Sequence, residues 1–355
     1  MPISRKILKL VCPSLGHTFH PSTFARLTVR EKSTRLENQR LWQIVRKPPR
    51  SPLSSRTGVR HLASFPVAGL RKAWKEQFGI DISRELRGLK TVERYECQAS
   101  GLRFYHPESA AGSADLYQQL ASFDWYYMRE KWEYEQALPF CHAGAKVLEV
   151  GSGAGEFLKR LRTRGVDGYG LEINSASRKK CLQDGLKVHT IKLSGLRTSS
   201  FDIVCAFQVL EHVPQPLEFL RECVRILRPG GRLILATPNT GSSLLEKPVL
   251  LDMPPHHLTG WQDQTYRFLE TLLPLQLLEC RKEPLAVEHL DFWIGTVRQN
   301  GPARFFWRVM PKKALRFLLR WGGRRLILGQ GILVIFRKKG RLSGQKGPHK
   351  PDGRS

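Results

Sequence analysis

A glycine-rich segment offers the clearest chemistry in this sequence. It reads L-E-V-G-S-G-A-G over residues 148–155 and directly follows an apolar run. Glycines between a strand and a helix let a ligand approach the backbone and permit positive φ. A dinucleotide-binding loop of the G-x-G-x-x-G type would need glycine at position 156, where the chain has Glu156. Because Glu149 and Glu156 would repel a pyrophosphate, the loop favours a ligand that lacks phosphate and carries positive charge.

A further acidic residue, Glu172, ends the next predicted strand, 21 residues after Gly151. A carboxylate in this position has the reach to accept two hydrogen bonds from a ribose diol. S-adenosylmethionine (SAM) combines a ribose with a sulfonium, an ammonium and a single carboxylate. The sequence therefore predicts SAM as the cofactor.

Three histidines are candidates for acting on a methyl acceptor. His212 follows the fourth predicted strand, and His256 and His257 follow two prolines in a later loop. Methyl transfer from a sulfonium depends mainly on alignment, and a hydroxyl acceptor also benefits from a base with a near-neutral pKa. Histidine is the natural candidate for such a base. Packing or capping is the alternative role for each of the three.

The order of these segments resembles that of class I SAM-dependent methyltransferases. The glycine loop, Glu172, the segment F-D-I-V-C-A-F-Q-V-L-E-H-V (201–213) and the sequence L-R-P-G-G (227–231) occur at the spacing typical of that family. The resemblance covers roughly residues 135–290. Within the family, the chain is most similar to the O-methyltransferases of ubiquinone biosynthesis.

The resemblance implies roles for residues of the glycine loop and of two strand ends. The residues expected around the methionyl part of SAM are Glu149, Gly151, Gly153 and Gly155. Glu172 would hold the ribose, while Gln208 and Val209 would lie beside the sulfonium and the reacting methyl. Residues 191–194 lack the acidic side chain that contacts adenine in many relatives, so backbone groups and apolar contact are expected there instead.

The elements that must position these residues alternate between strand and helix. Apolar strands are predicted at 146–150, 169–173, 187–193, 202–208, 232–237, 275–280 and 332–336. Strands this apolar, separated by helices, indicate a parallel sheet that is covered on both faces. We therefore expect an α/β fold with a doubly wound, mostly parallel sheet in three α/β/α layers, whose ligands bind at the carboxyl ends of the strands.

Several helix starts can also be predicted. Asn174 and Ser175 are both good N-cap residues, and Pro216 suits the first turn of a helix. Thr259 with Gln262 three residues later has the pattern of a capping box. We expect a helix to begin at each of these places.

Charge is concentrated at the two ends of the chain. The sequence has 58 Lys and Arg against 31 Asp and Glu, a net charge of +27. Residues 1–60 carry +11 and residues 301–355 carry +14, which leaves +2 for residues 61–300. The near-neutral middle argues against a nucleic-acid-binding core. Basic ends suit an anionic membrane surface or loose polyanion contact, with solvated charge as the alternative.

Composition divides the chain into five regions. We expect a basic, mostly disordered extension (1–70), a helical cap segment (71–138), the SAM-binding methyltransferase domain (139–300), a basic amphipathic helix with a final strand (301–340) and a disordered tail (341–355). A few of the aromatic side chains that are dense near the end of the cap segment are expected to line a substrate mouth.

Residues 303–321 interleave aromatic with cationic side chains. This pattern fits an amphipathic helix in an anionic membrane interface, and packing on the sheet edge is the alternative. No apolar stretch reaches the ~18 residues of a membrane-spanning helix. We expect a cytoplasmic protein with peripheral membrane contact. A mitochondrial location is the alternative, since the N-terminus is rich in Arg and poor in acids.

The seven cysteines are scattered and form no C-x-x-C pair. Cys97 is followed by Ser100, where distant relatives have a second cysteine of a metal knuckle. We therefore expect neither a disulfide framework nor a bound metal.

Taken together, these features predict an enzyme that transfers a methyl group from SAM to a small-molecule or lipid-linked acceptor, at a hydroxyl oxygen. A non-catalytic SAM-fold binding protein is the first alternative. An RNA methyltransferase is the second, although the N/D-P-P-Y/F-type signature is absent at Thr237-Pro238-Asn239. No specific nucleic-acid partner is expected.

Overall fold

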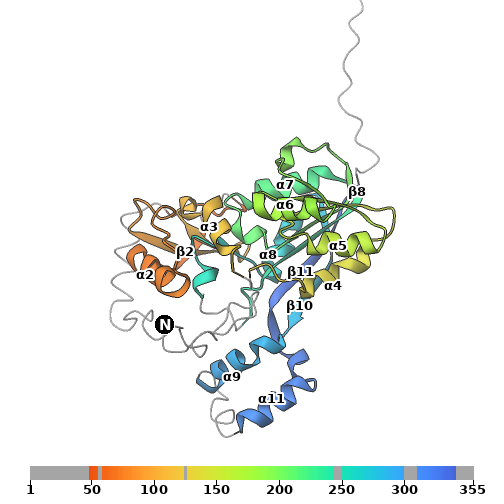
Figure 1. The fold of residues 1–355 in the computed structure, drawn as a ribbon. Helices are drawn as coiled ribbons and strands as arrows, with labels where there is room; N and C mark the ends of the chain where they lie inside the picture. Colours follow the sequence, from red (N-terminus) through yellow and green to blue (C-terminus); the bar gives the residue numbers. More distant parts are fainter. Residues whose placement is uncertain (1–47, 55–57, 124–125, 243–248, 300–309, 341–355) are drawn as a thin grey trace, which may run out of the picture.

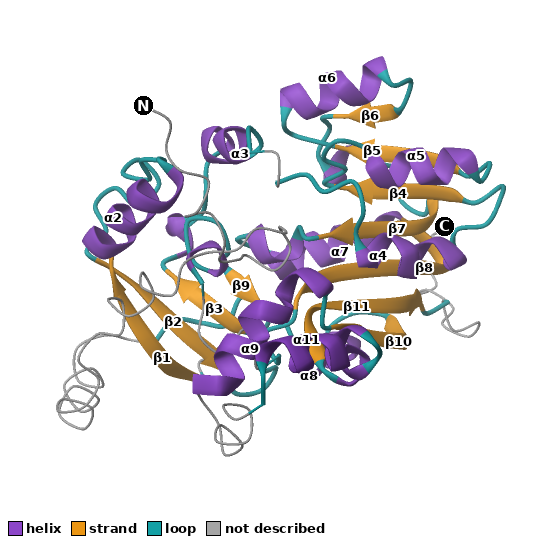
Figure 2. Ribbon diagram, turned by 60° about the horizontal axis from the view of Figure 1, so that its bottom comes forward, coloured by secondary structure: helices purple, strands orange, loops and turns teal. Residues whose placement is uncertain are grey.

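The computed structural model describes residues 48–54, 58–123, 126–242, 249–299 and 310–340. These residues form a seven-stranded sheet, a smaller four-stranded sheet and a pair of helices near the C-terminus (Figures 1 and 2). The expectations for residues 1–47 and 341–355, and for residues 303–309 of the amphipathic helix, lie outside the described residues.

The large sheet has the strand order β10-β11-β8-β7-β4-β5-β6. Its strands are β4 (Lys146–Val150), β5 (Asp167–Leu171), β6 (Lys187–His189), β7 (Phe201–Phe207), β8 (Leu227–Pro238), β10 (Leu275–Pro284) and β11 (Leu328–Lys338). The strands from β4 to β8 are parallel, and β10 and β11 are antiparallel. This confirms the predicted α/β fold. The chain crosses from one half to the other between β4 and β7, and such a switch point favours ligand binding at the carboxyl ends.

Helices cover both faces of this sheet. The helices on one face are α4 (Trp132–Ala137), α5 (Glu156–Thr163) and α6 (Ser175–Gln183), and those on the other are α7 (Pro216–Ile226) and α8 (Asp263–Phe268). Successive side chains of a strand point to opposite faces, so Val147 packs with Phe157 of α5, whereas Leu148 belongs to the core that includes Leu220 of α7. Burial on both faces explains why the strands are almost wholly apolar.

Two of the predicted helix starts are confirmed. Asn174 caps α6, since its side-chain oxygen accepts a hydrogen bond from the Ser177 backbone N–H at 3.0 Å. Pro216 is the first residue of α7, where its missing N–H costs nothing.

The predicted capping box at Thr259 is wrong. Thr259 belongs to the two-residue strand β9 (Thr259–Gly260), and α8 begins only at Asp263. The Thr259 hydroxyl donates to the Leu210 carbonyl and accepts from the Trp261 indole N–H. Because this hydroxyl is hydrogen-bonded to Leu210 and Trp261, it is not available to cap a helix.

A second sheet replaces the helical segment that was expected near the N-terminus. Its strands, in the order β1-β2-β3-β9, are antiparallel: β1 (Val59–Pro66), β2 (Thr91–Cys97), β3 (Arg103–His106) and β9. Helices α2 (Val67–Phe78) and α3 (Ala114–Leu120) accompany it. Ordered structure therefore begins before residue 70. Phe104 of β3 shares a core with Trp261, which ties the small sheet to the large one.

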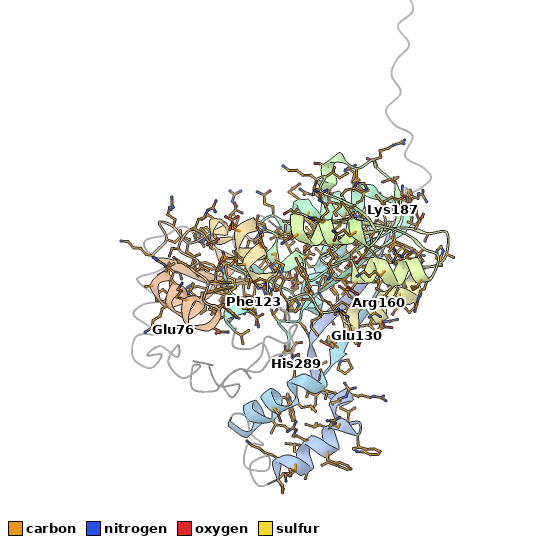
Figure 3. All side chains as sticks on the ribbon, viewed as in Figure 1. Glu76, Phe123, Glu130, Arg160, Lys187 and His289 are labelled. Atoms are coloured by element: carbon orange, nitrogen blue, oxygen red, sulfur yellow. The ribbon has the colours of Figure 1, made fainter. Side chains whose placement is uncertain are left out.

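The helices α9 (Leu290–Gln299) and α11 (Lys312–Arg320) project from the end of β10 and β11 (Figure 1). Leu290, Ile294, Leu315 and Leu319 form a separate small core between them. His289 lies where this pair joins the rest of the molecule (Figure 3). Among the described residues, no helix has both the length and the apolar character required to cross a membrane.

Candidate active site

A cavity lies at the carboxyl ends of β4, β5 and β7, where the switch point of the sheet predicts a ligand site. It is open to solvent, with an empty volume of about 1140 Å³. Its walls include Gly151–Ala154, Glu172–Asn174, Phe207–Val209, Glu211, His212, His256, His257, and Tyr117, Tyr126, Tyr127 and Tyr134. The predicted cofactor residues and the predicted catalytic histidines thus share one cavity, apart from Glu149 and Gly155.

The glycine loop forms one wall through its backbone. Gly151 and Gly153 have φ of +73° and +50°, a region that favours glycine. A Cβ atom at Gly153 would lie 2.8 Å from Tyr127 Cε1, and one at Gly151 would lie 2.5 Å from a methyl of Val209. Any larger residue would therefore disturb the wall of the cavity as well as strain the backbone.

Glu172 lies beside this loop and is only 6% exposed. Its two carboxylate oxygens accept the backbone N–H groups of Gly153 and Asn174, each at 2.7 Å. Burial raises the pKa of Glu172, while these N–H groups act in the opposite direction. Each carboxylate oxygen can accept a second hydrogen bond, as a ribose diol would require.

Two residues of the predicted cofactor set lie behind the wall. Glu149 is 1% exposed, and burial raises its pKa well above the usual range. Gly155 precedes α5 with φ of +77°, and a Cβ there would meet Leu186 and Cys181. Both residues support the loop from beneath, and neither is among the residues that line the described cavity.

Gln208 and Val209 come directly after β7, as the sequence predicted. Gln208 has a φ of +56°, which is unusual for a residue other than glycine. Its backbone N–H donates to Ala236, and its side-chain amide donates to Glu133 at 3.3 Å. These bonds hold the strand end in a conformation that turns the chain toward the histidines.

His212, His256 and His257 form a compact cluster that lines the same cavity. The ring centroid of His212 lies 4.6 Å from that of His256 and 4.7 Å from that of His257. The rings of His256 and His257 are stacked, with centroids 4.4 Å apart. Consecutive residues in a strand would face opposite ways, but here both backbone N–H groups donate to the Met253 carbonyl. This tight turn directs both rings to one side.

Backbone pairing fixes the histidine loop in place. The Leu258 N–H donates to the carbonyl of Glu211 at 2.8 Å, and the Tyr105 N–H donates to the carbonyl of Leu258 at 2.8 Å. The loop is therefore held between the end of β7 and strand β3 of the small sheet. The small sheet thus serves the site by positioning His256 and His257.

Hydrogen bonds orient the rings of His212 and His256, and an ion-pair contact accompanies His257. His212 Nδ1 lies 2.7 Å from the His256 carbonyl oxygen, and His256 Nδ1 lies 2.8 Å from the Leu251 carbonyl oxygen. His257 Nδ1 lies 3.4 Å from a carboxylate oxygen of Asp252. Burial lowers the pKa of His212 to about 3 and that of His256 well below its usual range. Both rings are therefore neutral near pH 7.

Glu211 is a further functional candidate that lines the same cavity. It is 1% exposed, and within the described part of the chain neither carboxylate oxygen has a hydrogen-bond partner. Burial raises the pKa of Glu211 to about 7, although nearby His257 lowers it. Its place next to His212 in the sequence was the available signal.

Tyrosines from the segment that precedes β4 form another part of the cavity wall. Tyr117 donates to the His256 carbonyl at 3.2 Å, and the Tyr126 hydroxyl lies 3.3 Å from His256 Nε2. Burial raises the pKa of both phenols. The sequence predicted that some aromatic residues of this region line a substrate mouth, without identifying which.

The residues present fit SAM. Ser152 Oγ, on the cavity wall, is buried and has no partner among the described residues. Beside Glu172, the apolar side chain of Ile173 is 77% exposed on the same wall, which gives a surface for a planar base. Residues 191–194, where adenine contact was expected, are not among the residues that line this cavity.

Comparisons with known proteins agree with this geometry. A family profile described as a methyltransferase domain matches residues 125–274. The ubiquinone biosynthesis O-methyltransferase of Psychrobacter cryohalolentis is 34% identical over 108 residues, covering 27% of this chain and 42% of that protein. The enzyme of the same name from Xanthomonas oryzae pv. oryzae is 35% identical over 106 residues, covering 27% and 44%. This chain thus matches less than half the length of these relatives.

Among solved structures, a SAM-dependent methyltransferase from Archaeoglobus fulgidus is similar to this chain with a TM-score of 0.41 and 19% identity, covering 64% of this chain and 95% of that one. The family match and the strand order, together with the glycine loop at the switch point, agree on one assignment. Residues 125–274 are a class I SAM-dependent methyltransferase domain.

Proposed function

We propose that the protein transfers the methyl group of SAM to an oxygen atom of a small-molecule or lipid-linked acceptor. One observation carries this proposal: the glycine loop with Glu172 and the histidine cluster face a single cavity. SAM, when bound, supplies a methyl group already activated by the sulfonium. The remaining tasks of the protein are to align the acceptor and exclude water, and alignment can contribute ~7–11 kcal/mol.

The chemistry of the cavity wall formed by the histidines favours an oxygen acceptor. Three imidazoles and the buried carboxyl of Glu211 lie together there, in reach of one bound molecule. A hydroxyl must lose its proton during transfer, whereas a carboxylate or amine needs less help. We propose that His212, His256 and His257 act on the acceptor oxygen. The names of the two relatives described above, both O-methyltransferases, support the same class of acceptor.

An apolar acceptor agrees with the surface around the projecting helices. Phe317, Leu318 and Trp321 of this region are each more than half exposed. Cationic side chains lie beside them on α11, which suits contact with an anionic membrane. We propose that the protein works at the cytoplasmic surface of such a membrane, where a prenylated phenol or a lipid-linked sugar is available.

The test is a transfer assay with methyl-labelled SAM. Purified full-length protein is offered extracted lipids, quinone precursors, lipid-linked glycans and, as a separate arm, total RNA. Label should enter an organic-extractable acceptor and remain stable to mild base, as an ether does. Labelled RNA would replace the proposal with the RNA alternative. Saturable SAM binding with no label in any arm would favour the non-catalytic alternative.

A further inference from the structure

We propose that His212, His256 and His257 together bind one divalent transition-metal ion of the Zn²⁺ class at the acceptor side of the cavity. The metal's role in methyl transfer rests on the proposed function, whereas its binding does not. The cysteine pattern alone predicts no bound metal, and this prediction does not take the three histidines into account. Their convergence becomes visible only in the fold.

The first argument is convergence. One ring nitrogen from each histidine lies within 4.8 Å of the nitrogens from the other two. Three ligands at the usual metal–nitrogen distance of ~2.0–2.1 Å in a tetrahedral site are about 3.3 Å apart. The side chains would have to close by no more than about 1.5 Å to reach that geometry. Imidazole is also a ligand type that suits zinc, copper, iron and nickel.

The second argument is the orientation of the rings. In each histidine, Nδ1 lies near an oxygen: the His256 carbonyl, the Leu251 carbonyl or the Asp252 carboxylate. A metal-binding histidine almost always donates one ring N–H to a carbonyl or carboxylate in this way, which leaves the other nitrogen for the metal. This arrangement leaves Nε2 of His212 and of His256 as candidate ligands, and the ion-pair contact of His257 Nδ1 with Asp252 favours Nε2 of His257 as the third.

The third argument comes from the surroundings. The buried carboxylate oxygens of Glu211 have no hydrogen-bond partner among the described residues, and this side chain lines the same cavity. A buried carboxylate is costly without a nearby positive charge. A dication held by the neighbouring imidazoles would provide one. The Tyr126 hydroxyl, 3.3 Å from His256 Nε2, would have to yield that position to the metal.

A site with three protein ligands retains at least one open coordination position. Since all three histidines line the cavity, that position is available to a bound acceptor. The ligand class is therefore a molecule with a hydroxyl or phenolic oxygen that can coordinate the metal. A metal-bound hydroxyl loses its proton more readily than a free one. The three histidines would then act as a unit rather than one of them serving as the base.

Metal binding is tested directly on the full-length protein without an affinity tag. The protein is stripped with a chelator, exchanged into chelator-free buffer and titrated with Zn²⁺ by calorimetry. A parallel titration with Co²⁺ follows the visible absorption that reports four-coordinate geometry. We expect one ion per chain. His212→Ala, His256→Ala and His257→Ala should each weaken Zn²⁺ binding more than any other tested change, because each removes one of the three ligands. Asp252→Asn should weaken it by about 10–100-fold.

Controls separate ligand loss from loss of folding. His142→Ala removes an exposed histidine outside the cavity and should leave the affinity unchanged. His257→Gln, similar in size to histidine, is compared with the wild type by thermal unfolding in the stripped state. Absence of Zn²⁺ binding by the wild type, or binding as tight as the wild type's in the His212, His256 and His257 variants, overturns the inference. SAM binding by the stripped protein is measured separately, so that failure of the metal site is distinguished from failure of the proposed function.

Discussion

The two walls of the cavity are built in different ways. Most of the cofactor wall comes from one short stretch, residues 151–174, in which the Gly153 backbone N–H donates to the Glu172 carboxylate. The acceptor wall gathers side chains from distant parts of the chain, with Tyr117 donating to the carbonyl of His256. One wall is largely backbone within a local strand–loop–helix unit, and the other is largely side chains held by tertiary contacts.

This difference implies that substitutions in one wall should not impair the function of the other. A backbone wall is sensitive to any added Cβ but supplies few groups that titrate or react. A side-chain wall can be altered without moving the backbone that holds the cofactor. Changes on the acceptor wall should therefore affect turnover, and changes on the cofactor wall should affect SAM affinity.

The largest effect is expected from the histidines. His212→Ala, His256→Ala and His257→Ala should each lower the rate of methyl transfer by about 10²–10⁴-fold, the usual contribution of proton-transfer assistance, because the three side chains are expected to assist the acceptor hydroxyl as one unit. The SAM dissociation constant should stay unchanged, since the glycine loop is untouched. Both quantities are measured on each variant. Wild-type kcat in all three variants would show that the acceptor wall has no part in the chemistry.

The next effect concerns the cofactor wall. Gly153→Val places a side chain where φ is +50° and where Tyr127 Cε1 is 2.8 Å away from a Cβ. Holding the loop in its cofactor-binding conformation would then cost about 3 kcal/mol in backbone strain and overpacking, so SAM binding measured by calorimetry should weaken by about 100-fold. Gly165→Val is the matched control, because it also has positive φ but no atom within 4 Å of the added Cβ. Equal SAM affinity in the Gly153 variant and the wild type would remove this wall from the site.

A smaller effect with a pH signature is expected at Glu172. The ribose diol donates to the ionised carboxylate, so SAM binding should be strongest above the pKa of Glu172 and weaken as pH falls through it. Burial raises this pKa, so the decline should begin at a higher pH than for an exposed glutamate. Glu172→Ala should weaken binding by about 10–100-fold at pH 7.5, since hydrogen bonds to a charged group contribute ~1.5–3 kcal/mol.

The pH dependence of SAM affinity needs its own control because Glu211 also titrates near the cavity, with a pKa of about 7. Glu172→Gln should flatten the decline between pH 7.5 and 5, whereas Glu211→Gln should preserve it. His212 does not interfere, since burial lowers its pKa to about 3. A decline that persists in Glu172→Gln would assign the pH dependence to another group.

The contrast between the walls also explains what could be predicted from the sequence. The glycine loop, the Asn174 cap and the apolar strands are local patterns, and the structure has them near the expected positions, although β6 ends at His189 rather than at residue 193. Gln208 and Val209 follow from the same logic, because they end a strand. Local patterning therefore located most of the cofactor wall and the layered fold.

The acceptor wall depends on pairings between residues that are far apart in the sequence. Thr259 has the pattern of a helix cap, but it pairs with Phe104 in the small sheet instead. This sheet consists of short strands whose paired residues lie up to 157 positions apart in the sequence, as for Arg103 and Gly260. No short-range hydrophobic pattern reveals such pairing. The same separation hid the convergence of His212 with His257, and with it the candidate metal site.

The smallest effect should come from the projecting helices, which lie outside both walls. Leu315 and Leu319 of α11 pack with α9 residues in a separate small core, which agrees with the alternative of a packing role for this helix. Its other face exposes Phe317, Leu318 and Trp321. An apolar face flanked by cations favours an anionic membrane interface over solvated charge alone.

Each Lys or Arg near such a surface contributes about 1 kcal/mol at low salt, or about fivefold in binding. Arg320→Gln should therefore weaken sedimentation with phosphatidylserine-containing vesicles by about fivefold, with no change in SAM affinity. Trp321→Ala combined with neutralised Arg316 and Arg320 should abolish it. Lys180→Gln with Arg197→Gln removes two exposed cations elsewhere and should have little effect.

Because screening weakens these contacts as salt rises, binding should occur at low salt and only to the anionic vesicles. Failure to bind them at low salt would leave α11 with a packing role alone.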